Sequence, residues 1–452
     1  MRRSLFLITG LLLITAVFSV AQRPLAPTPP MGWNSWDSYG KTATEDTLRR
    51  TANVMARDLK QYGWTYIVTD DGWFMNNPGE NDARRFNFAM DANGRYIPAV
   101  ATHPSAANNA GLKPLIDYVH SRGLKFGIWI IRGIPREAVA KNLPIAESKF
   151  HAADAADQSD ACPWNVYNWG VKDNAAGQAY YDSIAKLYAG WGVDFIKADC
   201  IAHDPYKVDE IRMLSDAIRK SGRAMVLSLS PGPAALANAD EMAKHAEMWR
   251  ISGDVWDHWG PDPQIEWSQS VRDQFATAAA WNRQWGPKKA STGHWPDADM
   301  LVIGNLPHAG TGSPRKTKLT ADEQVSMMTL WSIFRSPLII GGDLLSLDAL
   351  TRSLLTNKAV LDVDQHSKDN RAVITDDKVA IWTARPDSAA GRYVSVTNLA
   401  DSQQSFDYDW TKLGLASGSH AVRDLWKSED LGAQPSLKVT LQPHASVLYR
   451  VQ

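Results

Sequence analysis

Four pairs of charged side chains lie at or just beyond the ends of short apolar runs. They are Asp70 with Asp71, Lys197 with Asp199, Arg250 with Asp254, and Asp297 with Asp299. Adjacent carboxylates repel each other, so a site that keeps both must offer donors, as the neighbouring hydroxyls of a polyol do. The chain has no His-Glu-x-x-His metal motif and no Gly-x-Ser-x-Gly nucleophile elbow. Paired carboxylates without either motif indicate glycoside hydrolysis, in which one acid attacks the sugar and the other transfers the proton.

Each of these pairs also has a structural alternative. An Asp that follows a strand often only caps a helix or forms a turn. Lys197 and Asp199 point to the same face of a strand because they are two residues apart, and there they could form a buried ion pair. We favour function because active sites of barrels lie at this strand end, whereas Asp194 lies at the other end and is expected to be structural. Three histidines near the same segments could contact substrate or be ordinary loop residues: His203, His258 and His294.

The elements that must position these residues alternate between short apolar runs and helical patterns. The predicted strands are Met31–Trp36, Tyr66–Asp70, Leu124–Ile131, Val193–Asp199, Ala224–Ser230, Glu247–Ser252, Asp299–Ile303 and Pro337–Ile340. The predicted helices cover residues 44–62, 108–122, 177–190, 206–221 and 320–335, with capping boxes at Thr42-x-x-Glu45 and Thr320-x-x-Glu323. Apolar strands separated by helices predict a parallel sheet that is covered on its faces. Eight such units favour a (β/α)8 barrel over a doubly wound sheet, and no phosphate-binding glycine motif follows the first strand.

The pattern changes after about residue 360. Short strands divided by Gly, Asp, Asn and Ser turns follow, with no helical pattern between them: Val379–Trp382, Tyr393–Thr397, Ser405–Trp410, Leu437–Thr440 and Ala445–Val451. This arrangement predicts a small antiparallel β-sandwich. We therefore expect a barrel over residues 22–360 and a sandwich domain over 361–452.

The first residues have the pattern of an export signal. Arg2 and Arg3 precede an apolar run, Leu5–Val20, that is shorter than the ~20 residues of a membrane span. Small residues at Ser19 and Ala21 fit cleavage after Ala21. We expect residues 1–21 to be a signal peptide and the protein to be secreted or periplasmic, with an uncleaved membrane anchor as the alternative.

Composition excludes several other classes. Lys and Arg total 48 and Asp and Glu total 49, a formal net charge of −1, so the chain lacks the basic excess of a nucleic-acid-binding protein. Two cysteines are too few for a disulfide scaffold or a Cys-rich zinc module. The 19 tryptophans exceed the 13 tyrosines and 11 phenylalanines, and indole faces suit sugar rings, although a Trp-rich core is the simpler explanation.

Five motifs in order resemble glycoside hydrolase family 27, the family of α-galactosidases and α-N-acetylgalactosaminidases. They are Pro30–Trp36 (PMGWNSW), Asp70–Trp73 (DDGW), Lys197–Cys200 (KADC), Trp249–Arg250 with Asp254, and Trp295–Leu301 (WPDADML). The family's (β/α)8 barrel and C-terminal β-sandwich agree with the predicted architecture. The resemblance implies no metal ion and no organic cofactor.

The resemblance also implies the catalytic roles. Asp199 would be the nucleophile that forms a glycosyl-enzyme, and Asp254 would protonate the leaving oxygen and then activate water. Lys197 would stabilise the ionised nucleophile and bond to a sugar hydroxyl. Asp257 is a competing acid/base candidate, but the spacing of Asp254 from Arg250 fits the family better.

Other matching residues would bind the sugar. Asp70 and Asp71 match the pair that holds the 4- and 6-hydroxyls of galactose. Trp36 matches the indole that forms a wall of the sugar site. Arg250 and Asp299 match residues near the 2-hydroxyl.

The chain departs from the family pattern at several positions. Trp129 stands where the family often has tyrosine. Cys200 follows the nucleophile by one residue rather than two, and a Cys162–Cys200 disulfide is still expected in an oxidising compartment, with two unpaired thiols as the alternative. Ser230 is expected near the fifth-strand position that has Glu in α-galactosidases and Ser in N-acetylgalactosaminidases, but the altered motif leaves the 2-substituent of the sugar open.

The segment of residues 134–176 is unusually long for a barrel loop. Long loops at the catalytic end often carry specificity, so Trp164, Tyr167 or Trp169 is expected either to line the aglycone side or to serve only in loop packing. The leading hypothesis is a retaining α-galactosidase acting on terminal α-galactosides. The rivals are α-N-acetylgalactosaminidase and β-L-arabinopyranosidase activities, and a catalytically silent carbohydrate-binding protein. We expect no nucleic-acid partner and no membrane attachment after signal removal.

Overall fold

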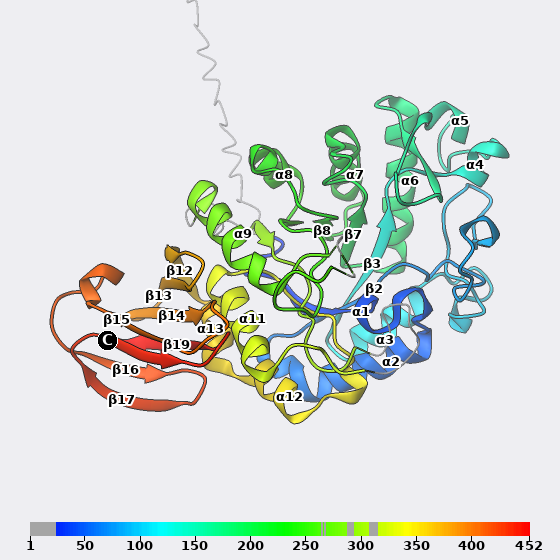
Figure 1. The fold of residues 1–452 in the computed structure, drawn as a ribbon. Coiled ribbons are helices and arrows are strands. Elements are labelled where there is room, and N and C mark those ends of the chain that lie inside the picture. The colour runs from blue at the N-terminus through cyan, green and yellow to red at the C-terminus, as the bar shows by residue number, and fades with distance from the viewer. Residues whose placement is uncertain (1–23, 264, 266–267, 287–292, 307–314) are drawn as a thin grey trace, which may run out of the picture.

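A barrel of eight parallel strands forms the N-terminal part of the computed structural model, which describes residues 24–263, 265, 268–286, 293–306 and 315–452 (Figure 1). The predicted signal peptide lies outside the described residues. Neighbouring strands follow chain order around the sheet, and β1 pairs with both β2 and β11. The strands are β1 (Met31–Asn34), β2 (Tyr66–Thr69), β3 (Lys125–Ile131), β7 (Phe195–Asp199), β8 (Val226–Leu229), β9 (Met248–Arg250), β10 (Trp295–Asp297) and β11 (Leu338–Ile340). The predicted barrel is confirmed.

The seventh strand was predicted in the wrong place. The strand is β10, whereas the predicted segment, Asp299–Ile303, contributes only an isolated bridge. Pro296 in the middle of β10 lacks the N–H of a ladder residue, and this made the true strand unconvincing in the sequence. Leu301 closes the barrel: its N–H donates to Ile339 O at 2.7 Å, and its carbonyl accepts from Gly341 N at 3.0 Å.

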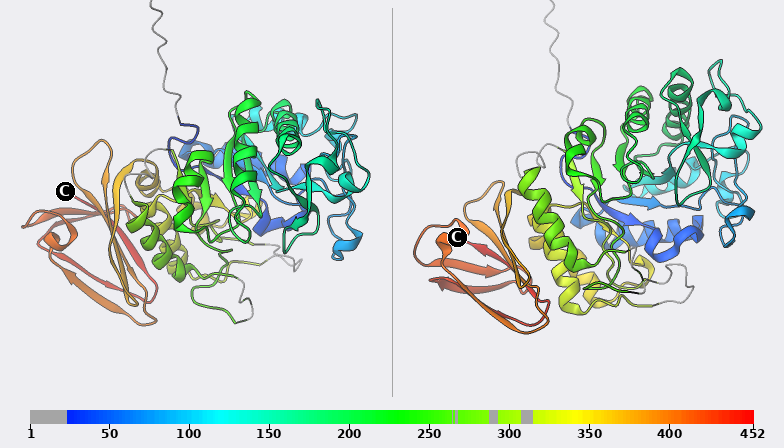
Figure 2. Two further views of the ribbon diagram at one scale, coloured as in Figure 1. Left: turned by 90° about the horizontal axis from the view of Figure 1, so that it is seen from above. Right: turned by 45° about the horizontal axis from the view of Figure 1, so that its top comes forward.

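Helices cover the outside of the barrel (Figures 1 and 2). They are α2 (Glu45–Val54), α3 (Lys113–Ser121), α6 (Ala175–Trp191), α7 (Val208–Lys220), α8 (Ala239–His245), α9 (Val271–Gln284), α11 (Ala321–Phe334), α12 (Ala349–Thr356) and α13 (Lys358–Gln365). The short helix α1 (Trp36–Tyr39) instead lies at the carboxyl end of β1. The capping box at Thr320 and Glu323 is confirmed. The box at Thr42 is wrong, because Thr44 is the N-cap of α2 and Glu45 pairs with Arg49.

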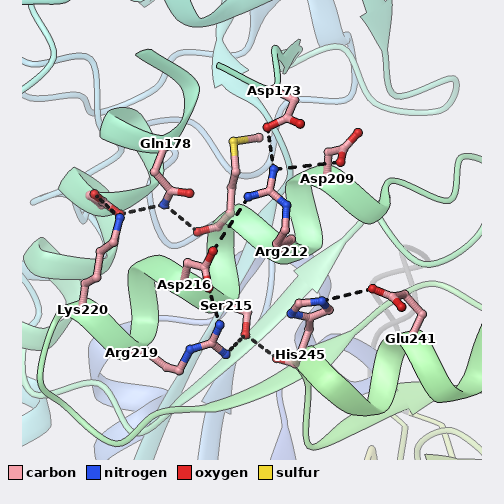
Figure 3. A network of polar contacts seen from close by, with 12 residues as sticks. Asp173, Gln178, Asp209, Arg212, Ser215, Asp216, Arg219, Lys220, Glu241 and His245 are labelled. Carbon is pink, nitrogen blue, oxygen red and sulfur yellow. Dashed lines mark hydrogen bonds and ion pairs between the residues drawn. The ribbon is translucent and has the colours of Figure 1, made fainter. Parts of the chain in front are cut away.

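A polar network joins the outer helices α6, α7 and α8 (Figure 3). Gln178 on α6 donates to the carbonyl of Met213 on α7 at 3.0 Å, and Ser215 on α7 donates to the carbonyl of His245 at the end of α8 at 2.8 Å. Arg212 forms an ion pair with Asp173, which precedes α6, at 2.5 Å. Exposed ion pairs contribute little stability alone, whereas the bonds to carbonyls join neighbouring helices directly.

The long segment after β3 forms a small insertion of its own. Its elements are β4 (Ile134–Pro135), α4 (Arg136–Ala140), α5 (Ala152–Ala155), β5 (Ala156–Ala161) and β6 (Asn168–Val171), and its sheet order is β4-β6-β5. The predicted disulfide is present and joins Cys162 to Cys200, just after β7. Buried Arg132 adds ion pairs to Asp160 at 2.9 Å and Glu210 at 2.7 Å. These links anchor the insertion at the carboxyl ends of β3 and β7.

The C-terminal part is the predicted antiparallel sandwich. Its strands are β12 (Ser367–Thr375), β13 (Val379–Pro386), β14 (Arg392–Asn398), β15 (Gln404–Tyr408), β16 (His420–Asp424), β17 (Glu429–Gln434), β18 (Leu437–Leu441) and β19 (Ser446–Val451). Six of them form one sheet, β12-β13-β14-β19-β16-β17, and β15 pairs with β18. Strands β12, β16 and β17 were not predicted from the sequence. In β17 the reason is clear, because Glu429–Gln434 is largely exposed and has no apolar alternation.

The sandwich packs on α9 and α11, at the end of the molecule opposite the insertion (Figures 1 and 2). Asn282 on α9 donates to the carbonyl of Asn370 at 2.8 Å, and Trp426 donates to Thr329 on α11 at 2.9 Å. None of the predicted site residues lies in the sandwich. No helix in the described part of the chain has the length and apolar character needed to cross a membrane.

Candidate active site

Asp199 is the last residue of β7, and both of its carboxylate oxygens are held. The indole N–H of Trp129 on β3 donates to Oδ2 at 2.8 Å, and the backbone N–H of Cys200 donates to Oδ1 at 2.9 Å. Burial raises the pKa of Asp199, while the Lys197 charge and the Trp129 bond act in the opposite direction. The two donors keep this carboxylate oriented at the strand end.

Lys197 lies two residues earlier on β7 and reaches Asp70. Its Nζ is 2.8 Å from Asp70 Oδ2, which also accepts a 2.8 Å hydrogen bond from the side-chain amide of Asn34. Burial lowers the pKa of Lys197, but the charges of Asp70 and Asp199 outweigh it, so the pKa is raised. This lysine therefore remains a cation between two acids that come from different strands.

Asp71 follows Asp70 but points to a different partner. The Tyr167 hydroxyl of the insertion donates to Asp71 Oδ2 at 3.0 Å, and Oδ1 is buried with no hydrogen-bond partner in the described part of the chain. Burial raises the pKa of Asp71 to about 7, although the charge of Lys41 and the Tyr167 bond lower it. Oδ1 of this buried acid can therefore accept a hydrogen bond from a bound ligand.

Arg250, at the end of β9, bridges two further acids through one guanidinium nitrogen. Its Nη2 is 2.6 Å from Asp299 Oδ2 and 3.2 Å from Asp254 Oδ1. The side chain of Asp254 is 48% exposed, whereas Asp299 is buried and its Oδ1 has no partner among the described residues. Burial raises the pKa of Asp299, against the charge of Arg250. The structure therefore offers one solvent-accessible acid and one buried acid on the same arginine.

The competing candidates have structural partners. Asp257 pairs with Arg315 at 2.5 Å and accepts the N–H of Lys318 at 2.7 Å, so it is fully engaged. Asp194 precedes β7 and bonds His120 and Arg223, as the structural interpretation predicts.

The histidines considered as substrate contacts differ in their surroundings. His258 bonds Gly260 O and Ser268 within its own loop, whereas His294, just before β10, bonds Ala246 O at the end of α8. His203 lies 3.7 Å from the exposed carboxylate of Asp204 and contacts none of the acids described above.

Two predicted sugar-site residues form no side-chain hydrogen bond with the acids in the described part of the chain. Trp36 begins α1 directly after β1, with a half-buried side chain, and its N–H donates to Asn34 Oδ1 at 2.8 Å. Ser230 follows β8 and is buried. It lines a cavity of about 20 Å³ inside the barrel together with Lys197, Arg250, Asp297 and Asp299. A cavity of this size holds about one water molecule, and Ser230 shares its lining with apolar side chains such as Val68 and Phe195.

The aromatic residues of the insertion separate into different environments. Trp164 is 52% exposed, and the ring of Trp169 lies under the guanidinium of Arg136 at 3.9 Å. Tyr167 alone among the three bonds a predicted site residue.

Two polar side chains of this region, Asn34 and Asp37, and one contact of Tyr167 were not predicted from the sequence. Asn34 lies in the PMGWNSW motif at the end of β1, and this strand-end position was the signal that could have identified it. The bond between Tyr167 and Asp71 joins residues 96 apart in the chain, so no local sequence pattern predicts it. Asp37, on α1, is fully buried, and burial raises its pKa well above the usual value. Its Oδ2 has no hydrogen-bond partner among the described residues.

The chemistry available here is that of carboxylates. Among the described residues, no group of three or more His, Cys, Asp or Glu side chains is arranged to hold a metal ion. A buried carboxylate with two donors and an accessible carboxylate on an arginine instead fit nucleophilic attack with proton transfer.

Comparison with known proteins supports a carbohydrate-active site. Residues 168–366 match a family model described as alpha galactosidase A, and residues 376–451 match the alpha galactosidase C-terminal beta sandwich domain. A family 27 β-L-arabinopyranosidase from Geobacillus stearothermophilus has a similar crystal structure, with 42% identity and a TM-score of 0.88, covering 95% of this chain and 97% of that one.

Other relatives carry different activities in their names. A putative α-N-acetylgalactosaminidase from Bacillus halodurans is 38% identical, with a TM-score of 0.81, over 94% of this chain and 97% of that one. An α-galactosidase from Oryza sativa subsp. japonica is 28% identical over 94% of this chain and 85% of its own length. Identity at these levels over nearly complete chains shows that this protein belongs to glycoside hydrolase family 27.

Proposed function

We propose that this protein is a retaining exo-glycosidase that removes terminal α-D-galactopyranosyl residues from oligo- or polysaccharides. In the first step Asp199 attacks the anomeric carbon while Asp254 protonates the leaving oxygen. In the second step Asp254 takes a proton from water, and that water cleaves the glycosyl-enzyme.

The observation that carries this proposal is the difference between the two acids. Asp199 is buried, and its two oxygens accept bonds from Trp129 and Cys200, which suits a nucleophile that must be held in one orientation. The side chain of Asp254 is 48% exposed, which suits a group that exchanges protons with water and contacts the leaving group. The negative charge of Asp254 also raises the pKa of Asp199, so the two carboxylates interact electrostatically.

Galactose is favoured over its near relatives by the second acid of the Asp70–Asp71 pair. Arabinopyranose has the same ring hydroxyls but lacks the hydroxymethyl group on carbon 5. Asp71 keeps one buried oxygen without a partner among the described residues, and a primary hydroxyl would satisfy it. The 42% identity to a β-L-arabinopyranosidase makes that activity the second candidate.

The test is hydrolysis of a matched panel of aryl glycosides by the mature protein. The panel holds the p-nitrophenyl α-D-galactopyranoside, β-L-arabinopyranoside and N-acetyl-α-D-galactosaminide. We expect the highest kcat/KM on the α-galactoside. A higher kcat/KM on the arabinopyranoside would show that arabinopyranose, not galactose, is the preferred sugar. Activity on none of the three would favour the sugar-binding alternative.

The stereochemistry needs its own measurement. Proton NMR during early turnover should show α-galactose forming before mutarotation, because two displacements restore the configuration. Initial formation of the β-anomer would overturn the double displacement.

We also propose that the enzyme is exported by cleavage after Ala21. The support is the sequence pattern of Arg2 and Arg3 before the apolar run. N-terminal sequencing of the protein recovered outside the cytoplasm should begin at Gln22, and an intact Met1 would contradict cleavage.

A further inference from the structure

Among the described residues of the insertion, Tyr167 alone forms a hydrogen bond with the paired acids at the end of β2. It precedes β6 by one residue, yet its hydroxyl donates to Asp71 Oδ2 at 3.0 Å. Both residues are buried: Asp71 is 6% exposed and Tyr167 is 4% exposed. A hydrogen bond between two buried side chains restricts both, so the hydroxyl limits how the Asp71 carboxylate can rotate.

The ring of Tyr167 is itself fixed by aromatic neighbours. Its centroid lies 4.9 Å from that of Phe88, 5.7 Å from Phe86 and 6.2 Å from Phe74. Lys41 closes this cluster, with Nζ 4.4 Å from the Phe86 centroid. The tyrosine hydroxyl therefore occupies a defined position rather than following a mobile side chain.

The same surroundings control the charge of Asp71. Burial raises the pKa of Asp71 to about 7, and the Lys41 charge and the Tyr167 bond both lower it. The remaining oxygen, Oδ1, is buried and has no hydrogen-bond partner in the described ranges. A buried carboxylate oxygen without a partner is costly, so a ligand hydroxyl that reaches it gains a strong hydrogen bond.

The two acids of the pair have different surroundings. Asp70 Oδ2 is already held by Asn34 and Lys197 of the barrel strands, whereas Asp71 contacts the insertion. If Asp70 binds the hydroxyls of the sugar ring, the substituent on carbon 5 is the group that Asp71 binds. That group is a hydroxymethyl in galactose and a hydrogen in arabinopyranose.

We propose that Tyr167 is a specificity-determining positioning residue, which holds Asp71 so that the site prefers a pyranoside with a hydroxymethyl on carbon 5. The inference rests on the proposed function and assigns its sugar preference to one contact of the insertion. Tyr167 does not touch the reacting atoms and acts through Asp71.

The test compares Tyr167→Phe with the wild-type enzyme on p-nitrophenyl α-D-galactopyranoside and β-L-arabinopyranoside. We expect kcat/KM on the galactoside to fall about tenfold, the equivalent of one hydrogen bond to a charged group, mainly through a higher KM. The value on the arabinopyranoside should change by less than about twofold, so the ratio of the two falls. An equal loss on both substrates would overturn the proposal, because a purely structural role does not distinguish them.

Tyr96→Phe is the matched control. Tyr96 belongs to the same aromatic cluster, stacking on Phe74 at 4.1 Å, but its hydroxyl bonds Asn168 at 2.8 Å rather than Asp71. The substrate ratio of this variant should equal that of the wild type. A ratio that falls as far as in Tyr167→Phe would assign the effect to the cluster and overturn the role of the hydroxyl.

Calorimetric binding of free D-galactose and L-arabinose separates this inference from the proposed function. If the wild type hydrolyses neither glycoside, the proposed function fails, yet the ratio of the two affinities still decides the role of Tyr167. A ratio that favours galactose in the wild type and falls in Tyr167→Phe supports the inference. An unchanged ratio, or no binding of either sugar by the wild type, overturns it.

Discussion

The indole N–H of Trp129 donates a 2.8 Å hydrogen bond to Oδ2 of Asp199, across two adjacent barrel strands. Trp129 and Lys197 occupy paired positions on β3 and β7, so the indole reaches the carboxylate two residues further along. Because the bond is charge-assisted, it both orients the carboxylate and favours its ionised form.

Replacement of Trp129 by Phe should therefore weaken the nucleophile without opening a large cavity. Loss of a hydrogen bond to a charged group costs about 1.5–3 kcal/mol, or roughly 10–100-fold in kcat/KM. The Trp129 bond lowers the pKa of Asp199 against the effect of burial, so its removal should move the acidic limb of the kcat/KM profile to higher pH. A pH–rate profile measures both effects, and an unchanged acidic limb would refute this role of the indole.

Asp199→Asn should abolish turnover and leave sugar binding largely intact. The amide keeps the shape of the carboxylate but cannot form the glycosyl-enzyme. Calorimetry with D-galactose provides the binding measurement, and chromogenic hydrolysis provides the rate. Turnover equal to that of the wild type would remove Asp199 from the nucleophile role.

Asp254→Ala should affect substrates according to their leaving groups. General acid catalysis contributes about 10²–10⁴-fold, so natural galactosides should lose most activity. Activated aryl galactosides need little protonation and should retain their first step. Azide should then restore turnover by attacking the glycosyl-enzyme in place of activated water. A parallel loss on all substrates with no azide rescue would contradict the acid/base role.

Glu247 supplies a pH-dependent stability test away from the candidate site. It precedes β9, at the end opposite Asp254, and accepts the Leu227 N–H at 2.7 Å. Burial raises the pKa of Glu247 from 4.5 to about 7. The folded protein thus keeps a proton that the unfolded chain has released between these values, so stability is lost as the pH rises from about 4.5 through 7.

Glu247→Gln removes this titration while keeping an acceptor for Leu227. The Tm of the variant minus that of the wild type should therefore be larger at pH 8 than at pH 5. Thermal unfolding at both pH values measures the difference, and α-galactoside turnover should stay at the wild-type level. A difference that is the same at both pH values would show that burial of Glu247 does not shift its pKa.

Local patterns of the sequence were sufficient to predict the barrel and the sandwich. Short apolar runs indicate buried strands, and seven of the eight barrel strands were predicted close to their true positions, the first of them to complete the set of eight. The pattern failed at β10, where Pro296 interrupts the features of a strand. The capping box of α2 was also placed at Thr42 rather than Thr44, because the residue type that caps a helix occurs at both positions.

The acids of the candidate site were identified because the carboxyl ends of barrel strands meet at one edge. Their partners were not, because chain neighbours do not determine which side chains meet across the barrel. Tertiary packing decided that Arg315 engages Asp257, that Asn34 and Lys197 share Asp70, and that Tyr167 bonds Asp71.

The sequence by itself therefore determined the architecture and the family resemblance, and it indicated which acids lie at strand ends, since burial period and strand-end position are local properties. Only the tertiary structure decided that Asp199 is held by two donors while Asp254 remains open to water. Burial and hydrogen bonding of a carboxylate depend on residues that are distant in the chain, such as Trp129, 70 residues before Asp199. These long-range contacts distinguish two aspartates that are chemically identical in the sequence.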